Sequence, residues 1–179
     1  MKNAGTLKVT TPTDREIVMT RNFDALRTLV FDAMTKPELL KRWLSGPPGW
    51  SMVVCENDLK VGGAFRHVWR GPDGAELSMR GVYREVVPPE VGGVGGRTVR
   101  TESFEFGCNA QAAEQLGTLV LIEQDGRTTL TLTLLYPSKE ARDATIASGM
   151  EHGVAAGYDR LAELLASNAA RGDSQGGPR

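Results

Sequence analysis

Apolar and polar residues along the chain follow two different periods, and the switches between them predict the elements. Alternation with a period of two, typical of strands, recurs in seven segments that are mostly separated by turn residues. Spacing of three and four residues, typical of amphipathic helices, follows the first strand and the last strand. The predicted strands are residues 14–22, 51–56, 64–70, 76–87, 97–106, 116–124 and 127–136, and the predicted helices are residues 23–34, 36–44 and 138–166.

Two turn motifs indicate how the strands connect. Gly71-Pro72-Asp73-Gly74 and Asp125-Gly126 each lie between two predicted strands, and both are strong hairpin signals. Neighbouring strands that are joined by tight turns usually pair with each other in an antiparallel sheet. We therefore predict an α+β domain in which a curved antiparallel sheet of six to seven strands wraps around a long C-terminal helix, with two short helices after the first strand.

The predicted helix 138–166 carries three glycines on its apolar side. Gly149, Gly153 and Gly157 lie on or beside the apolar stripe, and each costs roughly 0.8–1 kcal/mol relative to alanine in a helix interior. Either the backbone approaches another element closely here, or the missing side chains leave room for a cavity. Ser138 is the predicted N-cap. The stripe consists of Ile146, Met150, Val154, Leu161, Leu164 and Leu165.

The two ends of the chain differ in composition from the segment between them. Residues 1–13 are mixed and lack a clear period, so we expect a flexible N-terminal arm. Residues 167–179 are small, polar and rich in glycine, which predicts a disordered C-terminal tail. Residues 14–166 should form one domain, long enough to bury a sizeable core.

Charge and cysteine content exclude several classes of protein. The net charge of −1 gives no basic field that would attract nucleic acid. No apolar run approaches the roughly 20 residues of a membrane helix. Cys55 and Cys108 lie far apart and form no CxxC motif, and the sequence shows no signal peptide. We therefore expect a soluble cytoplasmic protein with reduced cysteines, and neither a nucleic-acid nor a membrane partner.

Few residues could carry chemistry. His67 lies between Phe65 and Trp69 on one strand face, as a packed histidine bonded to a neighbour or as a polar handle inside an aromatic cavity. His152 should face solvent on the long helix. Metal binding needs three or four suitably spaced ligands, and no such spacing occurs, so we expect neither a metal nor another cofactor.

Charged residues on the predicted sheet have two interpretations. Glu102 and Glu105 must point to opposite faces, so one of them at most enters a pocket. Glu102, like His67, is a weak candidate for an acid or base, and an ion pair with a nearby arginine is the more common role. Four arginines suggest an anion-binding surface, but interleaved acids favour a solvated sheet face. They are Arg80, Arg84, Arg97 and Arg100.

Seven short motifs follow one another along the chain. They are residues 36–43 (KPELLKRW), the loop 46–50 (GPPGW), 61–66 (VGGAFR), 71–74 (GPDG), 81–90 (GVYREVVPPE), 136–138 (YPS) and 148–161. In this order they resemble the START-like or SRPBCC superfamily, in the branch related to the C-terminal domain of the activator of the Hsp90 ATPase. The resemblance covers roughly residues 14–166 and implies a helix-grip fold with a deep cavity between the sheet and the C-terminal helix.

The resemblance implies a pocket more than a reaction. We expect a small-molecule binding protein whose cavity holds an apolar or amphipathic ligand. Val154 stands where relatives often carry a bulky aromatic residue, which should enlarge or reshape the pocket. The predicted ligand-binding residues are Trp43, Trp50, Phe65, His67, Trp69, Met79, Tyr83, Phe104, Met150, Val154 and Gly157.

Two alternatives and one open question accompany this expectation. The first alternative is a chaperone-linked interaction module with an Hsp90-type partner. It is weakened because the sequence has no separate N-terminal domain of the kind that contributes to Hsp90 binding. The second is a cyclase, dehydratase or hydrolase-like enzyme that uses His67 or Glu102 as acid or base. Whether the chain forms a homodimer stays open.

Overall fold

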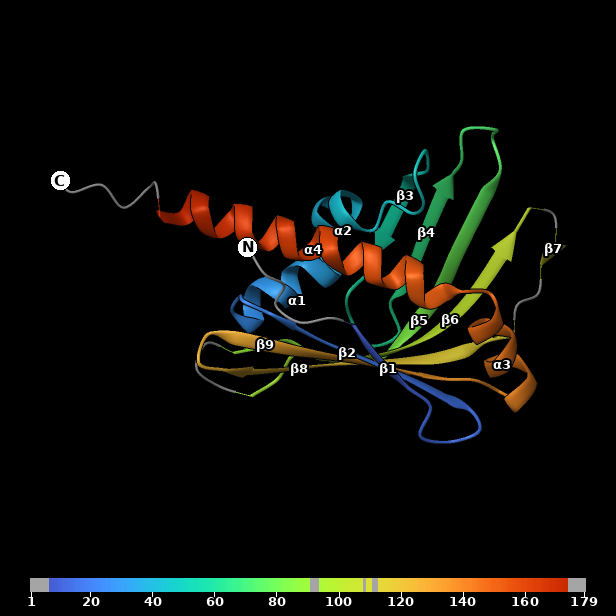
Figure 1. The fold of residues 1–179 in the computed structure, drawn as a ribbon, viewed down its shortest axis with the longest axis horizontal. Coiled ribbons are helices and arrows are strands. Elements are labelled where there is room, and N and C mark those ends of the chain that lie inside the picture. Colours follow the sequence, from blue (N-terminus) through green and yellow to red (C-terminus); the bar gives the residue numbers. More distant parts are fainter. Residues whose placement is uncertain (1–6, 91–93, 108, 111–112, 174–179) are drawn as a thin grey trace.

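A computed structural model describes residues 7–90, 94–107, 109–110 and 113–173 of the chain (Figure 1). Within these residues one antiparallel sheet of nine strands is accompanied by four helices. The strands are β1 (Lys8–Thr10), β2 (Glu16–Phe23), β3 (Ser51–Asn57), β4 (Ala64–Arg70), β5 (Glu76–Val87), β6 (Arg97–Phe106), β7 (Asn109–Ala110), β8 (Gln115–Gln124) and β9 (Arg127–Leu135). The helices are α1 (Arg27–Thr35), α2 (Pro37–Trp43), α3 (Lys139–Ala147) and α4 (Met150–Asp173).

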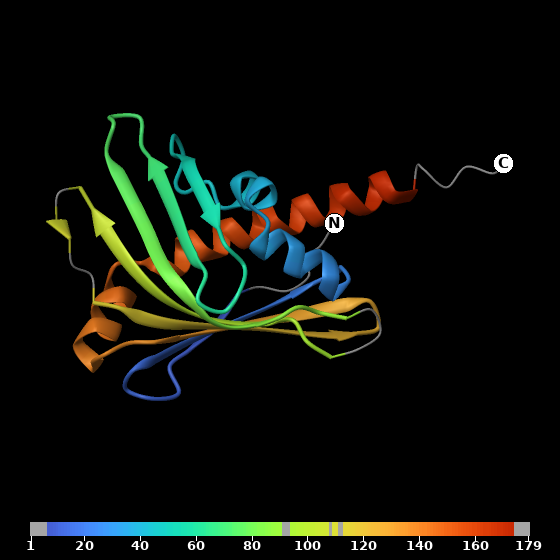
Figure 2. The same ribbon diagram turned by 180° about the vertical axis from the view of Figure 1, so that it is seen from behind.

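The sheet is strongly curved, and α1, α2 and α4 lie on the inner side of the curve. The strand order is β1-β2-β9-β8-β6-β5-β4-β3, with β7 paired to β6 at one end. Figures 1 and 2 show that β2, β8 and β9 run together along one side of the molecule, while β3, β4 and β5 rise away from them. Helix α4 crosses the concave face, and α1 and α2 lie beside it. The predicted α+β helix-grip architecture is confirmed.

Two short strands account for the larger strand count. β1 pairs with β2, from Lys8 opposite Thr20 to Thr10 opposite Val18, and so brings part of the predicted N-terminal arm into the sheet. β7 pairs with the end of β6. Neither strand is long enough to show a clear period of two, which needs about four residues, so the sequence pattern missed both.

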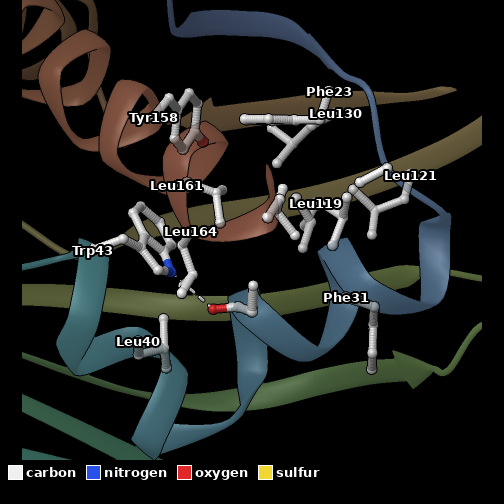
Figure 3. Close-up of a cluster of buried hydrophobic side chains, with 14 residues drawn as sticks. Phe23, Phe31, Leu40, Trp43, Leu119, Leu121, Leu130, Tyr158, Leu161 and Leu164 are labelled. Carbon is white, nitrogen blue, oxygen red and sulfur yellow. Dashed lines mark hydrogen bonds between the residues drawn. The ribbon is translucent and has the colours of Figure 1, made fainter. Parts of the chain in front are cut away.

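Three groups of buried side chains fill the interior. The main core contains apolar residues of α1, α2, α4, β2, β8 and β9, and Figure 3 shows its side chains converging from these elements. The end cluster consists of Ile17, Met19, Leu134 and Tyr136. The β3–β6 cluster consists of Met52, Phe65, Trp69, Met79 and Tyr83.

The predicted long helix is two helices, which corrects the sequence interpretation. Ser138 caps α3 as expected, because its Oγ accepts a hydrogen bond from the backbone N–H of Ala141 at 3.1 Å. The helix then ends at Ala147, and Gly149 adopts φ +74° in the left-handed region that favours glycine. Helix α4 starts at Met150 and continues to Asp173, beyond the boundary predicted at residue 166.

Candidate functional site

The inner face of β4 carries the aromatic row that the sequence predicts. Phe65, His67 and Trp69 are 2%, 1% and 7% exposed. The register places His67 beside Met79 of β5, and Met79 beside Phe104 of β6. One row of side chains therefore crosses three strands at the same level. The structure brings together Phe65, His67, Trp69, Met79, Tyr83 and Phe104, with Trp50 packed against them.

His67 is the polar member of this row. Neither of its ring nitrogens has a hydrogen-bond partner among the described residues. The ring lies 5.2 Å from Phe65 and 5.9 Å, edge-on, from Trp69, measured between centroids. Burial first, and the positive charge of Arg100 second, lower the pKa of His67 to about 3. The imidazole is therefore neutral near pH 7, with one nitrogen able to donate a hydrogen bond and the other able to accept one.

A buried ion pair lies on the same face. The guanidinium of Arg100 stacks on Phe65, with Cζ 4.1 Å from the ring centroid, and its Nε donates to Glu102 Oε1 at 3.0 Å. Gln115 Nε2 donates to the other carboxylate oxygen at 2.9 Å. Burial acts to lower the pKa of Arg100, but Glu102, together with Tyr83, more than offsets it, so the pKa is raised. Both charges are thus held in place by partners within the protein.

Gly117 makes room for that ion pair. It lies opposite Arg100 in the β6–β8 register. A Cβ at this position would come within 2.8 Å of Glu102 Oε1, closer than real Cβ contacts allow. The absence of a side chain on β8 therefore lets the carboxylate sit against the sheet.

Tyr83 uses its hydroxyl group to connect the sheet to the helical layer. Its Oη donates to Asn57 Oδ1 at 2.6 Å. Asn57 in turn donates from Nδ2 to the backbone oxygen of Thr35 at the end of α1. The phenol ring belongs to the β3–β6 cluster, while its polar end is satisfied elsewhere.

The three tryptophans have separate environments. Trp43 belongs to the main core, where its Nε1 donates to the backbone oxygen of Ala33 at 2.9 Å (Figure 3). Trp69 Nε1 donates to the backbone oxygen of Leu44 at 2.7 Å. Trp50 packs against the β3–β6 cluster and contacts Gly71, where a Cβ would come within 2.8 Å of its indole.

The predicted site residues on α4 lie apart from the β3–β6 cluster. Met150 packs on the end cluster, and Val154 packs on both the end cluster and the main core. Gly157 is buried beside Trp43. Among the residues that the structure describes, no side chain of α4 joins the β3–β6 cluster. The predicted site therefore divides into a strand group and a helix group.

The three glycines of the predicted stripe have three different surroundings. Gly149 forms the break between α3 and α4. At Gly153 an added Cβ would meet nothing within 4 Å, and the residue is exposed. At Gly157 an added Cβ would be in ordinary contact with Trp43, at 3.8 Å. Neither close packing nor a cavity explains all three.

The sequence interpretation missed the role of Arg100. We predicted a solvated sheet face for it, but its side chain is 20% exposed and covers Phe65. Strand parity contained the signal, because Arg100 shares the face of Glu102 and Phe104. Arg80 and Arg97 differ: they form exposed pairs with Glu105 and Glu85.

Other candidate sites are weaker. The described residues contain no group of three or more histidine, cysteine, aspartate or glutamate side chains that could hold a metal ion. None of the helices in the described part of the chain is long and apolar enough to span a bilayer. A depression of about 520 Å³ lies near the β8–β9 hairpin and shares no residue with the row on β4 to β6. It is lined by Asn22, Asp24, Gln124, Asp125, Gly126, Arg127 and Thr129.

Comparisons with known proteins agree with this architecture. The model of the family described as activator of Hsp90 ATPase homolog 1-like protein matches residues 24–166. A solved structure from Rhodobacter sphaeroides has a TM-score of 0.81 and 29% identity, covering 91% of this chain and 99% of that one. A protein from Mycobacterium smegmatis has a TM-score of 0.76 at 23% identity, covering 90% of this chain and 97% of that one. A protein from Nitrosomonas europaea has a TM-score of 0.74, also at 23% identity, covering 89% of this chain and 99% of that one. No curated protein matches the chain.

Proposed function

Because the chain belongs to the family of activator of Hsp90 ATPase homolog 1-like proteins, we propose that it binds a small apolar or amphipathic molecule against the inner face of β3 to β6. The observation that carries this proposal is the division of the interior. Helix α4 sends its apolar side chains to the main core and the end cluster, whereas the β3–β6 cluster receives none of them. The members of this cluster are 1% to 8% exposed, so a ligand reaches them only where the partly buried side chains around them, such as Trp50 and Phe104, move aside.

The chemistry of this face suits such a ligand. Binding sites for small molecules are mostly apolar and aromatic, with a few polar groups that fix orientation. Here Phe65, Trp69 and Met79 supply apolar surface, and His67 supplies a polar group without a partner in the described residues. Trp50 and Phe104 are half-buried at the border of the cluster, where an entering molecule would first make contact.

A titration with N-phenyl-1-naphthylamine, a neutral fluorescent probe, tests the proposal. We expect saturable binding and NMR shift changes centred on Phe65, Trp69 and Met79. Phe104→Trp narrows the border of the cluster and should weaken binding at least about tenfold, since hydrophobic contacts depend on shape. Ile122→Trp, at an exposed position of β8, is the matched control and should leave affinity unchanged. Equal affinity in all three proteins, or shift changes confined to other elements, would reject this site.

A second candidate function comes from the family itself. Its description names activation of the Hsp90 ATPase, so the chain is also a candidate for an interaction module of an Hsp90-type chaperone. ATP hydrolysis by a purified Hsp90-type chaperone, measured with and without the full chain, tests this role. A rate that rises with a saturable dependence on the chain supports the module, and an unchanged rate at saturating concentrations rejects it.

A further inference from the structure

His67 is placed for recognition by more than its burial. Its ring lies in the middle of the row on β4 to β6, between the rings of Phe65 and Trp69 and next to Met79. It is 1% exposed, and neither nitrogen has a partner in the described part of the chain. A buried polar group without a partner loses its hydration and gains no compensating bond. A ligand that bonds to one of the two nitrogens would restore part of that loss.

The charged and polar groups nearby are already engaged with one another. Arg100 is paired with Glu102, and Gln115 donates to the same carboxylate. The hydroxyl of Tyr83 donates to Asn57. Because the two charges of the ion pair oppose each other, the face presents little net charge to a ligand. This arrangement favours a neutral ligand over an anion or a cation, since a buried charge without a partner is costly.

The neutral imidazole selects the polar group of that ligand. It offers one N–H donor and one nitrogen acceptor. The two nitrogens point away from each other across the ring, so one small polar group bonds to one of them. A hydroxyl group can either donate to the bare nitrogen or accept from the N–H, whereas a carbonyl or a carboxylate can only accept. The flanking aromatic rings favour a flat partner, because aromatic pairs gain from stacked or edge-on contact beyond the area that they bury.

We propose that His67 binds the hydroxyl group of a neutral hydroxylated aromatic molecule held among Phe65, Trp69 and Met79. This inference rests on the proposed function, because it specifies the ligand class of the same site. It assigns to His67 the role of a specificity-determining residue and requires no chemical step.

Three related probes test the ligand class: naphthalene, 2-naphthol and 2-naphthoate, titrated at pH 7 into the full chain. We expect 2-naphthol to bind more tightly than 2-naphthoate. We also expect the ratio of the naphthalene Kd to the 2-naphthol Kd to fall by roughly fivefold to tenfold in His67→Leu, as expected from the loss of one hydrogen bond. His152→Leu changes the exposed histidine of α4 and should leave that ratio unchanged.

A second measurement needs no variant at His67. The chain contains two histidines, so a nitrogen-15 spectrum of the imidazole groups shows two patterns, and His152→Leu assigns them. Adding 2-naphthol should move both nitrogen signals of His67, whereas naphthalene should move them much less.

The outcomes separate the two proposals. If all three probes bind equally, or if 2-naphthol leaves the His67 signals unchanged, the ligand class is wrong while binding at this face stands. Tighter binding of 2-naphthoate, with His67 becoming protonated, would also overturn the ligand class. If none of the three probes binds while N-phenyl-1-naphthylamine does, only the ligand class fails; if N-phenyl-1-naphthylamine does not bind either, both proposals fail.

Discussion

The inner face of the sheet has two halves that are filled in different ways. The half formed by β2, β8 and β9 is covered by helices, and Leu130 and Leu161 there are 0% exposed. The half formed by β3 to β6 buries a histidine and an ion pair among its aromatic rings. Leucine packing gives close contact and stability, whereas buried polar groups are costly unless each one is bonded. The helix-covered half also buries a charge, Arg21, but its guanidinium pairs with Asp159 of α4 at 2.7 Å. We therefore expect the larger share of the stability in the helix-covered half, and a cost in the β3–β6 half, where neither nitrogen of His67 has a partner among the described residues.

The largest expected effect tests the helix-covered half. Leu161→Ala should lower the free energy of unfolding by about 4 kcal/mol, because it leaves a cavity among tightly packed side chains. Urea denaturation measures the change. Phe104→Ala, at a half-buried position of the other half, should cost about 1 kcal/mol. Equal losses for the two variants would remove the distinction between the halves.

The second largest expected effect concerns the ion pair between Arg100 and Glu102 in the β3–β6 half. Glu102→Gln should cost about 3 kcal/mol, because Arg100 would keep its charge without a full partner. Glu105→Gln is the matched control: it breaks the pair with Arg80 on the exposed side of β6, where Arg80 is 64% exposed, and should cost less than about 1 kcal/mol. Denaturation at low and high salt compares them. A similar cost for both variants would show that the Glu102 carboxylate is effectively solvated.

The pH dependence of the free energy of unfolding tests whether His67 is buried in its neutral form. The unfolded chain binds a proton at this residue below about pH 6.5, while the folded protein does so only near pH 3. Stability must therefore fall as the pH falls through this window, by about 2 kcal/mol between pH 7 and pH 5 at roughly 1.4 kcal/mol per pH unit. The pH dependence of chemical denaturation should flatten in His67→Leu and persist in His152→Leu. An unchanged slope in His67→Leu would mean that another group causes the loss of stability at acid pH.

The smallest expected effects concern two glycines near the start of α4. Gly153→Ala should stabilise the protein by about 0.8 kcal/mol, because alanine is the better helix former and its Cβ meets nothing within 4 Å. Gly149→Ala should destabilise it by about 1 kcal/mol, because alanine is strained at a φ of +74°. Thermal melting of both variants gives the signs. Stabilisation by Gly149→Ala would indicate that α3 and α4 can join into one helix.

Much of the fold could be predicted because local signals agree with the final structure. The predicted boundaries of β4, β5 and β6 match the observed ones, since turn residues flank clear alternation. The turn at Asp125 and Gly126 has positive φ at both residues, as a type I′ hairpin requires. The break at Gly149 was missed because apolar spacing continues across it from Ile146 to Met150.

The candidate site was predictable only strand by strand. Parity places His67 with Phe65 and Trp69, but no local pattern tells which half of the sheet a helix covers. For that reason the sequence grouped Val154 and Met150 with residues that belong to another cluster. The engagement of Glu102 with Arg100 and Gln115 depends on three positions of two strands coming into register, and charge counting along the chain does not reveal it.

The pairing of β2 with β9 also sets the order in which the molecule can be completed. Asn22 and Thr129 bond across this pair although they are 107 positions apart in the chain. During synthesis, β2 therefore cannot pair with β9 until the β8–β9 hairpin has left the ribosome, and α4 leaves the ribosome later still. Closing so long a loop slows folding. The strands β3 to β6, whose neighbours are close in sequence, can assemble first, so the face that carries His67 would form before the helix that crosses the sheet.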